Sequence, residues 1–112
     1  VRKEVLARWQ AIESPKAEFF RQISSKTLQF VREKLGREMM YGADPLAMAV
    51  AVEPACVKRH EAHYLVVETT GLFTRGQTAV DWADRSGKPK NAIVILDVDI
   101  ERFYALFEQG LQ

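Results

Sequence analysis

The chain has 112 residues, of which 47% are apolar and 28% are charged, and its formal net charge is +1. This length suits one compact domain or part of one, and the proportions are those of a globular protein rather than a disordered or fibrous one. The near balance of charge gives no overall field that would favour nucleic acid or a membrane surface.

The cysteine count and the lengths of the apolar runs indicate in which cellular compartment the protein is expected. Cys56 is the only cysteine, which excludes an internal disulfide and a thiolate metal cluster and favours a reducing cytosol. No apolar run approaches the ~20 residues that a membrane span needs, and residues 1–10 are too charged for a signal peptide. We therefore expect a cytoplasmic protein with no membrane span and no nucleic-acid partner.

The first twelve residues predict a helix, because apolar residues recur on one side at steps of three and four. These residues are Val5, Leu6, Trp9 and Ile12. A second helix is predicted from Ser14, whose hydroxyl suits the N-cap, with Pro15 at the first helical position, where no N–H is needed. Gly36 is then expected as the C-cap. The apolar stripe of this second helix is predicted at Phe20, Ile23, Thr27, Val31 and Leu35.

A third helix is predicted to begin at Asp44-Pro45, with the Asp44 carboxylate as the capping group. Residues 46–52 are apolar on every side of a helix, so this helix is expected to be buried. A strand would also fit a run of this length, but the alanines and the cap favour a helix that ends before Pro54.

After Pro54 the pattern changes to strands. Residues 64–70 are rich in β-branched and aromatic side chains, and residues 78–82 alternate as a half-buried strand does. Residues 92–98 are apolar on both faces, as expected of an interior strand. Asp99 is expected to cap a last helix. The apolar stripe of that helix comprises Ile100, Phe103, Tyr104, Phe107 and Leu111.

The order of these elements predicts an α/β fold with about four helices and a three-stranded sheet. So small a sheet offers little cover for a helix that is apolar on every side. This mismatch favours an incomplete domain.

Few residues indicate chemistry on their own. Asp44 stands where it could meet a metal or a hydroxylated ligand, although an Asp before a Pro is more often only a helix cap. His60 and His63 would project from opposite faces of a strand with no third ligand, which favours surface histidines over a metal site. Cys56 has no histidine at a diagnostic spacing and is expected to be a small buried side chain.

Three further groups have a structural interpretation that is simpler than a catalytic one. The Thr74-Arg75-Gly76-Gln77 segment could bind an anion, but it lacks a glycine-rich phosphate loop and is better explained as a hairpin turn. Asp97 and Asp99 could share acid–base work, but helix capping explains Asp99 more simply. The aromatic residues of the last helix are expected to belong to the core.

Three blocks of the chain share their order and spacing with the motifs of one enzyme family. They are Tyr41-Gly42-Ala43-Asp44-Pro45-Leu46-Ala47, then Val66-Val67-Glu68-Thr69-Thr70-Gly71 with Thr74-Arg75-Gly76-Gln77-Thr78, and Leu96-Asp97-Val98-Asp99-Ile100-Glu101-Arg102-Phe103. From about Ser14 to its end, the chain resembles the nucleoside hydrolase family of the inosine/uridine-preferring type. The resemblance implies that residues 1–112 are the C-terminal segment of a domain with an open α/β sheet.

The resemblance also implies a function. Members of the family hydrolyse the N-glycosidic bond of purine and pyrimidine ribonucleosides, releasing base and ribose in nucleoside catabolism. Their Ca²⁺ holds the ribose diol and lowers the pKa of the attacking water, while an aspartate of an N-terminal cluster is the general base. The calcium-binding aspartate of the first block corresponds to Asp44. The full-length enzyme is expected to be a homo-oligomer.

The sequence departs from the family pattern in two ways. The family motif has a histidine that helps to protonate the departing base, but Ala43 occupies that position and cannot donate a proton. No catalytic residue is therefore assigned. The N-terminal Asp-rich motif, the general base and the ribose-binding Asn and Glu positions are absent from the chain, which is expected to be inactive alone and to bind calcium weakly.

Two other interpretations remain open. One is a non-catalytic nucleoside hydrolase-like module for binding or scaffolding, with Ala43 as the sign of lost chemistry. The other is an unrelated small α+β interaction domain, which predicts a cooperatively folded monomer. A segment of a larger domain should instead expose apolar surface.

Overall fold

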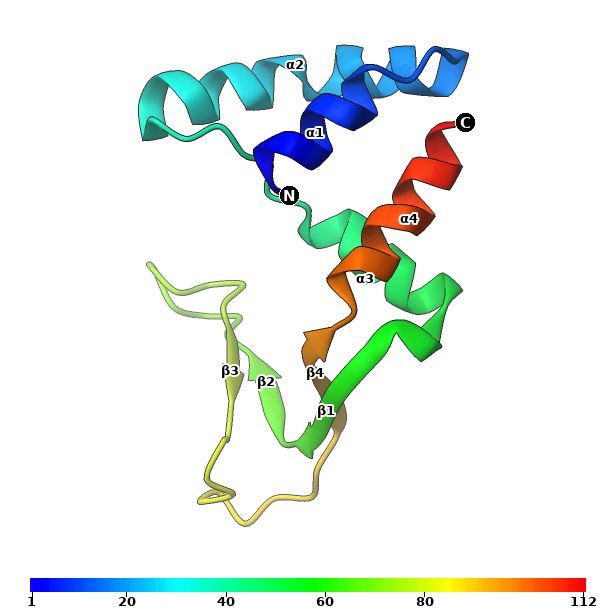
Figure 1. The fold of residues 1–112 in the computed structure, drawn as a ribbon. Coiled ribbons are helices and arrows are strands. Elements are labelled where there is room, and N and C mark those ends of the chain that lie inside the picture. The colour runs from blue at the N-terminus through cyan, green and yellow to red at the C-terminus, as the bar shows by residue number, and fades with distance from the viewer. The chain divides into compact units, whose positions relative to one another are not determined.

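The computed structural model describes residues 1–112, and the chain divides into two units (Figure 1). One unit, Val1–Cys56 with Asp99–Gln112, is helical, and the other, Val57–Val98, is built of strands. The helices are α1 (Lys3–Gln10), α2 (Pro15–Leu35), α3 (Ala43–Val52), the short 3₁₀ helix η1 (Pro54–Cys56) and α4 (Ile100–Leu111). The strands are β1 (Val57–His63), β2 (Leu65–Val67), β3 (Thr78–Val80) and β4 (Ala92–Val98). No helix combines the length and the apolar character needed to cross a membrane.

Three predicted capping residues define both ends of α2 and the start of α4. The Ser14 hydroxyl accepts a backbone N–H from the first turn of α2 at 3.0 Å and donates to the Leu111 carbonyl, so one side chain links α2 to the end of α4. Gly36 ends α2 with a φ of 61°, a left-handed conformation that glycine adopts without strain. Asp99 accepts the N–H of Arg102 at 3.0 Å and so caps α4. These three predictions are confirmed.

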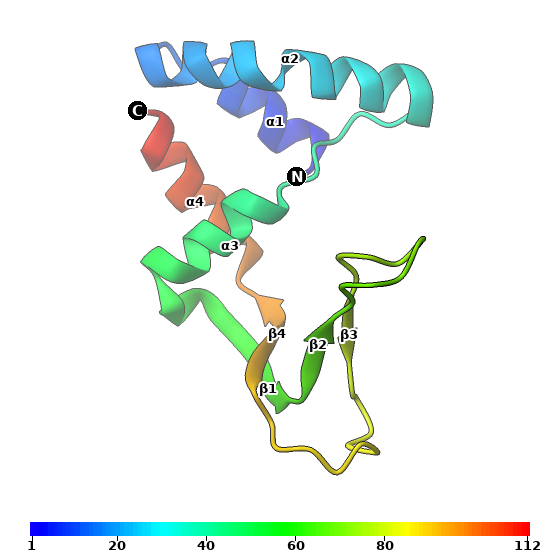
Figure 2. The same ribbon diagram turned by 180° about the vertical axis from the view of Figure 1, so that it is seen from behind.

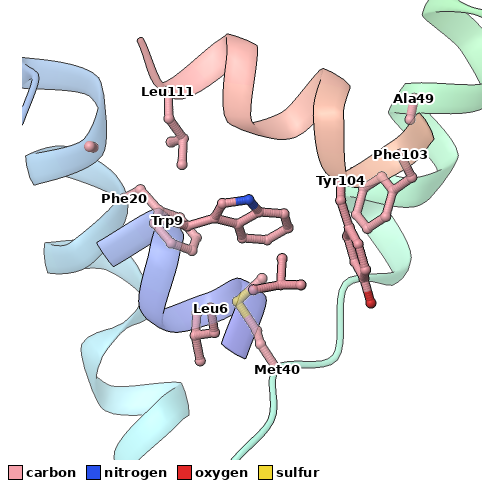
Figure 3. Close-up of a cluster of buried hydrophobic side chains, with 10 residues drawn as sticks. Leu6, Trp9, Phe20, Met40, Ala49, Phe103, Tyr104 and Leu111 are labelled. Atoms are coloured by element: carbon pink, nitrogen blue, oxygen red, sulfur yellow. The ribbon is translucent and has the colours of Figure 1, made fainter. Parts of the chain in front are cut away.

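The core of the helical unit is organised around Trp9 of α1, which is fully buried (Figure 3). The Trp9 ring centroid lies 4.3 Å from that of Phe107 and 5.8 Å from that of Tyr104, both on α4. Phe20 of α2 meets Trp9 in a T-shaped arrangement at 6.3 Å. Such aromatic pairs contribute ~0.5–1.5 kcal/mol each beyond the burial of their area. One side chain therefore holds three helices together.

Two ion pairs join α1 to α4 on the outside of this core. Arg8 Nε donates to Glu108 Oε2 at 2.9 Å, and Arg2 pairs with Glu101. The pairs follow the same order along both helices, so α1 and α4 run in the same direction. Because the arginine side chains are more than half exposed, each pair adds only ~0–1 kcal/mol and serves mainly to align the helices.

The buried face of α2 differs from the predicted stripe. Phe20 and Val31 are buried as predicted, but Ile23 and Leu35 are 60% and 47% exposed. The remaining inward positions carry small residues, Ala17 and Ser24. Small side chains give little signal in an apolar pattern, so the pattern placed the stripe too far toward Ile23.

Helix α3 is less buried than its composition predicts. It begins at Ala43 with Gly42 as its N-cap, so the prediction that Asp44 caps the helix is wrong. Only one residue of α3 is buried, while Met48 and Val52 are 64% and 69% exposed. One side of an apolar helix is thus open to solvent.

The strand unit contains two antiparallel pairs, β1 with β4 and β2 with β3, in place of the predicted three-stranded sheet. The bounds of β4 agree with the prediction. The segment of His60 and His63 was expected only to lead into a strand at residues 64–70, whereas it forms a strand of its own, β1. Its sequence, VKRHEAH, shows no run of apolar residues. Pairing with β4, in which His60 lies opposite Ile95 and Ala62 opposite Ile93, makes this polar segment a strand.

His63 is buried within the strand unit, contrary to the prediction of a surface residue. Only 6% of it is exposed, and its Nε2 lies 3.1 Å from Glu61 Oε2. Its ring meets that of Trp82 at 5.0 Å in a T-shaped arrangement, and its Nδ1 lies 3.8 Å from Asp84 Oδ1. His60, by contrast, is exposed as predicted.

We predict that Trp9→Ala unfolds most of the helical unit. Truncation of a buried Trp costs ~3–5 kcal/mol, a large share of the ~5–15 kcal/mol that stabilises a domain. Urea unfolding followed by circular dichroism at 222 nm should show an early transition or none. Phe73→Ala is the control, because Phe73 is 95% exposed and its loss should change stability by less than ~0.5 kcal/mol. Equal midpoints for Trp9→Ala and the unmodified chain would contradict the central role of Trp9.

Candidate functional site

Asp44 lies in the first turn of α3 and is exposed. No hydrogen bond or ion pair within the chain holds its carboxylate. The helix dipole favours a negative charge at this end of a helix. The backbone of Asp44 is therefore fixed by the helix while both carboxylate oxygens are available to a ligand.

An apolar groove of about 480 Å³ lies between α3 and α4, which cross each other in both views (Figures 1 and 2). Helix α3 lines it from Asp44 in its first turn to Val52 at its end, and Asp44 is the only charged residue of the lining. Leu106 and Phe107 line it from α4. Phe107 thus contributes to the core, as predicted, and also to a groove that the sequence did not predict.

The far end of α3 is bound to the start of α4. Arg102 Nε donates to Glu53 Oε1 at 2.6 Å, and the backbone N–H of Asp99 donates to the Cys56 carbonyl at 2.7 Å. Cys56 itself is 1% exposed and unpaired, which confirms the prediction of a small buried side chain. These contacts fix the direction of α3 and hence the place of Asp44 at its other end.

Ala43 is the first residue of α3 and is exposed beside Asp44. Its methyl group offers no proton to a departing base. Both histidines of the chain belong to the strand unit, so the helical unit has no imidazole of its own.

The chain does not assemble a metal site by itself. No three His, Cys, Asp or Glu side chains come close enough together to hold an ion. Ca²⁺ needs ~6–8 oxygen ligands, so a lone carboxylate is far from enough. Asp44 fits such a site as one oxygen donor, and the other donors would have to come from outside these residues.

The second block of motif residues forms the loop between β2 and β3. Glu68 Oε1 accepts the N–H of Thr70 at 2.7 Å and that of Gly71 at 3.0 Å. These backbone bonds, together with the Thr70 hydroxyl, hold the pKa of the Glu68 carboxyl below its ordinary value. A β-carbon at Gly71 would clash with the Thr74 hydroxyl, and Gly76 has a φ of 89°. The predicted turn is confirmed, and the turn itself accounts for these residue types.

The same chemistry shapes the turn that follows β3. Asp81 accepts the N–H groups of Arg85 at 3.0 Å and Ser86 at 2.8 Å. Hydrogen bonds from the Ser86 side chain and backbone lower the pKa of the Asp81 carboxyl. Glu68 and Asp81 thus both have structural partners in the loops of the strand unit.

A sequence profile of the family described as inosine-uridine preferring nucleoside hydrolase matches residues 1–105. The chain belongs to this nucleoside hydrolase family. The match begins at residue 1, so α1, which carries no recognisable motif, is part of the family domain as well.

Curated nucleoside hydrolases align with the chain over different lengths. Pyrimidine-specific ribonucleoside hydrolase RihA of Klebsiella pneumoniae subsp. pneumoniae is 35% identical over 106 residues, which cover 84% of this chain and 34% of that protein. RihA of Shewanella woodyi is 31% identical over 113 residues, or 100% of this chain and 36% of that protein. Non-specific ribonucleoside hydrolase RihC of Klebsiella pneumoniae is 50% identical over 40 residues, or 36% of this chain and 13% of that protein. The chain spans about a third of the length of the two RihA relatives.

A solved structure of an inosine-guanosine nucleoside hydrolase has the same fold, with a TM-score of 0.78 at 24% sequence identity. The similarity covers 96% of this chain and 33% of that one. The predicted α/β fold of the nucleoside hydrolases is thereby confirmed for this part of the domain.

We predict that acid loosens the Glu68 loop. A carboxyl whose folded pKa is lowered stabilises the loop above its unfolded pKa, and this contribution is lost as the pH falls through the folded pKa. The amide NMR signals of Thr70 and Gly71 should therefore titrate with a midpoint below ~4.3, the ordinary value for Glu. In Glu68→Gln, which keeps an acceptor oxygen but cannot ionise, this titration should vanish. A midpoint at or above the ordinary value would contradict the lowered pKa of Glu68 and the stabilising role of its hydrogen bonds.

Proposed function

We propose that this chain is the C-terminal segment of a cytoplasmic ribonucleoside hydrolase, in which Asp44 is one ligand of the catalytic Ca²⁺. The observation that carries the proposal is the family match over residues 1–105 combined with an unpaired Asp44 carboxylate at the edge of a groove. The reaction is hydrolysis of the N-glycosidic bond of a ribonucleoside to free base and ribose. On the family resemblance, the complete enzyme is a homo-oligomer.

The chain's own contribution to this chemistry is positional. When bound, the metal supplies the charge that orients the ribose diol and lowers the pKa of the attacking water. Asp44 presents a negatively charged oxygen from a helix that Glu53 and Arg102 hold in place. A ligand fixed in this way needs little reorganisation on binding. The general base and the remaining oxygen donors belong to the other part of the domain.

Ala43 limits how the departing base can be activated. Because this residue cannot protonate the departing base, leaving-group activation must come from another residue or from stacking of the base. The named relatives include pyrimidine-specific and non-specific hydrolases, so the family accommodates more than one base preference.

Ala43 also favours a second candidate function, a non-catalytic module with the nucleoside hydrolase scaffold. Such a protein would keep Asp44 and the ability to bind an ion or a nucleoside, but it would release no base. The two candidates differ in turnover rather than in fold. They are separated by measuring calcium retention and base release on the same protein.

We predict that a hybrid, in which this chain replaces the matching third of Klebsiella RihA, retains Ca²⁺ and releases free base from uridine or inosine. Loss of groups that merely support a metal ligand costs ~10–100-fold, so Asp44→Ala should lower turnover by at least ~100-fold. Atomic absorption and chromatography of released base provide the two measurements. Glu13→Ala, which removes another exposed carboxylate, is the control and should leave turnover unchanged.

The outcomes of this experiment discriminate the candidates. Unchanged turnover in Asp44→Ala would remove Asp44 from the site. A hybrid that retains calcium through Asp44 but releases no base would support the non-catalytic module instead.

We further predict that the 112-residue chain alone releases no base from inosine or uridine. A single carboxylate leaves most of the calcium coordination shell to water, so titration calorimetry should give a Kd weaker than ~1 mM. Detection of free base above the rate of a buffer blank would show that the chain contains a site of its own.

A further inference from the structure

A second cavity, of about 200 Å³, lies within the helical unit between α1, α2 and the segment that follows α2. Apolar side chains such as Leu6 of α1 and Leu28 of α2 form part of its lining. The charged residues of the lining are Lys3, Arg32, Arg37 and Glu38. Three of these four charges are positive, although the formal net charge of the whole chain is only +1. The cavity therefore concentrates positive charge in one concave place.

Lys3 and Glu38 neutralise each other at this cavity, where they form an ion pair. The hydrogen bond and the charge of Lys3 hold the pKa of the Glu38 carboxyl below its ordinary value, and the charge of Arg32 adds a smaller effect in the same direction. Arg32 is thus close enough to act on Glu38 through its electric field. The positive charge that stays uncompensated in the lining belongs to Arg32 and Arg37.

The two arginines keep most of their hydrogen-bond donors free. A guanidinium group carries several N–H donors in a planar fork. Arg37 Nη1 donates to the Tyr41 hydroxyl at 2.7 Å, which orients the side chain and leaves its other donors without a partner in the chain. Arg32 makes no hydrogen bond or ion pair within the chain. The cavity is therefore lined by two guanidinium groups that can still bind an anion.

We propose that this cavity binds a phosphate group, either as inorganic phosphate or as part of a small phosphomonoester. The planar fork of a guanidinium matches a pair of phosphate oxygens. A phosphate group carries about two negative charges at neutral pH, which balances the charge of Arg32 and Arg37. Pockets for larger ligands usually have ~300–1,000 Å³, so a cavity of about 200 Å³ favours a small ligand. Asp44 does not line this cavity, so the inference is independent of the proposed function.

The ends of two helices account for these basic residues only in part. Arg32 lies in the last turn of α2, where a cation offsets the negative end of the helix dipole, but Lys34 lies in the same turn and can do the same. Arg37 follows the C-cap Gly36, and capping does not require it to share a cavity with Arg32. Lys3 brings the first turn of α1 to the cavity, and this end of a helix favours an anion.

NMR titration of the Arg32 and Arg37 side-chain Nε–H signals tests the site. Inorganic phosphate, phenyl phosphate and phenol are added separately to the hybrid with Klebsiella RihA and to the 112-residue chain. Phosphate should shift both signals in a saturable way with a Kd of about 1 mM, the order expected of two charge-assisted contacts. Tighter binding of phenyl phosphate would identify the ligand as an organic phosphate, and equal binding would identify it as the free ion. Phenol, which is uncharged, should leave both signals unchanged.

Charge variants distinguish an anion site from solvated surface charges. Arg32→Gln and Arg37→Gln should each weaken phosphate binding at least ~10-fold, because each removes a charge-assisted contact. Glu38→Gln should strengthen it at least ~3-fold, because this change removes the only negative charge of the lining and releases Lys3. Lys26→Gln removes an exposed charge of α2 outside the cavity, so this control should leave the Kd unchanged.

Absence of saturable shifts in the hybrid would overturn the inference even if the isolated chain bound phosphate, because the rest of the domain would then cover the cavity. If the hybrid does not fold, the isolated chain decides by the same criteria. Shifts caused by phenol, or equal weakening by Lys26→Gln and the two arginine variants, would also overturn it. Base release is measured on the hybrid without phosphate. Phosphate binding without turnover would refute the proposed function and leave this site intact, and turnover without phosphate binding would do the reverse.

Discussion

The packing of α3 against α4 is the contact on which the candidate site depends. Trp9 fixes α4 within the helical core, and α4 in turn holds α3 through the ion pair of Arg102 with Glu53. Ala49, the one buried residue of α3, is small enough to let the two helices approach. Asp44 has no bond of its own to hold it, so its position is determined entirely by this succession of contacts. A core residue such as Trp9 therefore acts on the site at a distance, through the placement of two helices.

The helix ends that depend on nearby capping residues were predictable from the sequence, and so was the family. Ser14, Gly36 and Asp99 act on backbone groups within a few residues, and their side chains suffice to identify the helix ends. Asp44 shows the limit of this approach, because a preceding residue with high helix propensity, Ala43, enters the helix and moves the start upstream. The sequence correctly placed Asp44 at the start of a helix, but Gly42 is the N-cap residue and no side chain caps this end.

The features that escaped prediction depend on residues far apart in the chain. β1 has no run of apolar residues, and its pairing with β4 makes it a strand. His63 is buried because Trp82 and the turn carrying Asp84 lie beside it. The sequence around His63 contains no pattern that predicts this burial. The groove was missed for a related reason. Apolar periodicity assigns Phe107 to a core. It cannot distinguish a helix face that other residues of the chain cover from one that is partly open in a groove.

The motif residues divide into those that build the scaffold and those to which only the proposed function gives a role. Glu68 and Gly76 are explained by the hydrogen bonds and backbone conformation of one loop, so their presence supports the fold and says little about turnover. Asp44 and Ala43 are different, because the side chain of neither residue caps the helix. The first retains a charge suited to a cation, and the second lacks the proton that a leaving base requires. Since holding a metal and protonating a base are separate steps, a chain can keep one while losing the other. The scaffold is therefore compatible with both candidate functions. Under the proposed function, the difference between them lies in whether another group takes over the proton transfer that Ala43 cannot perform.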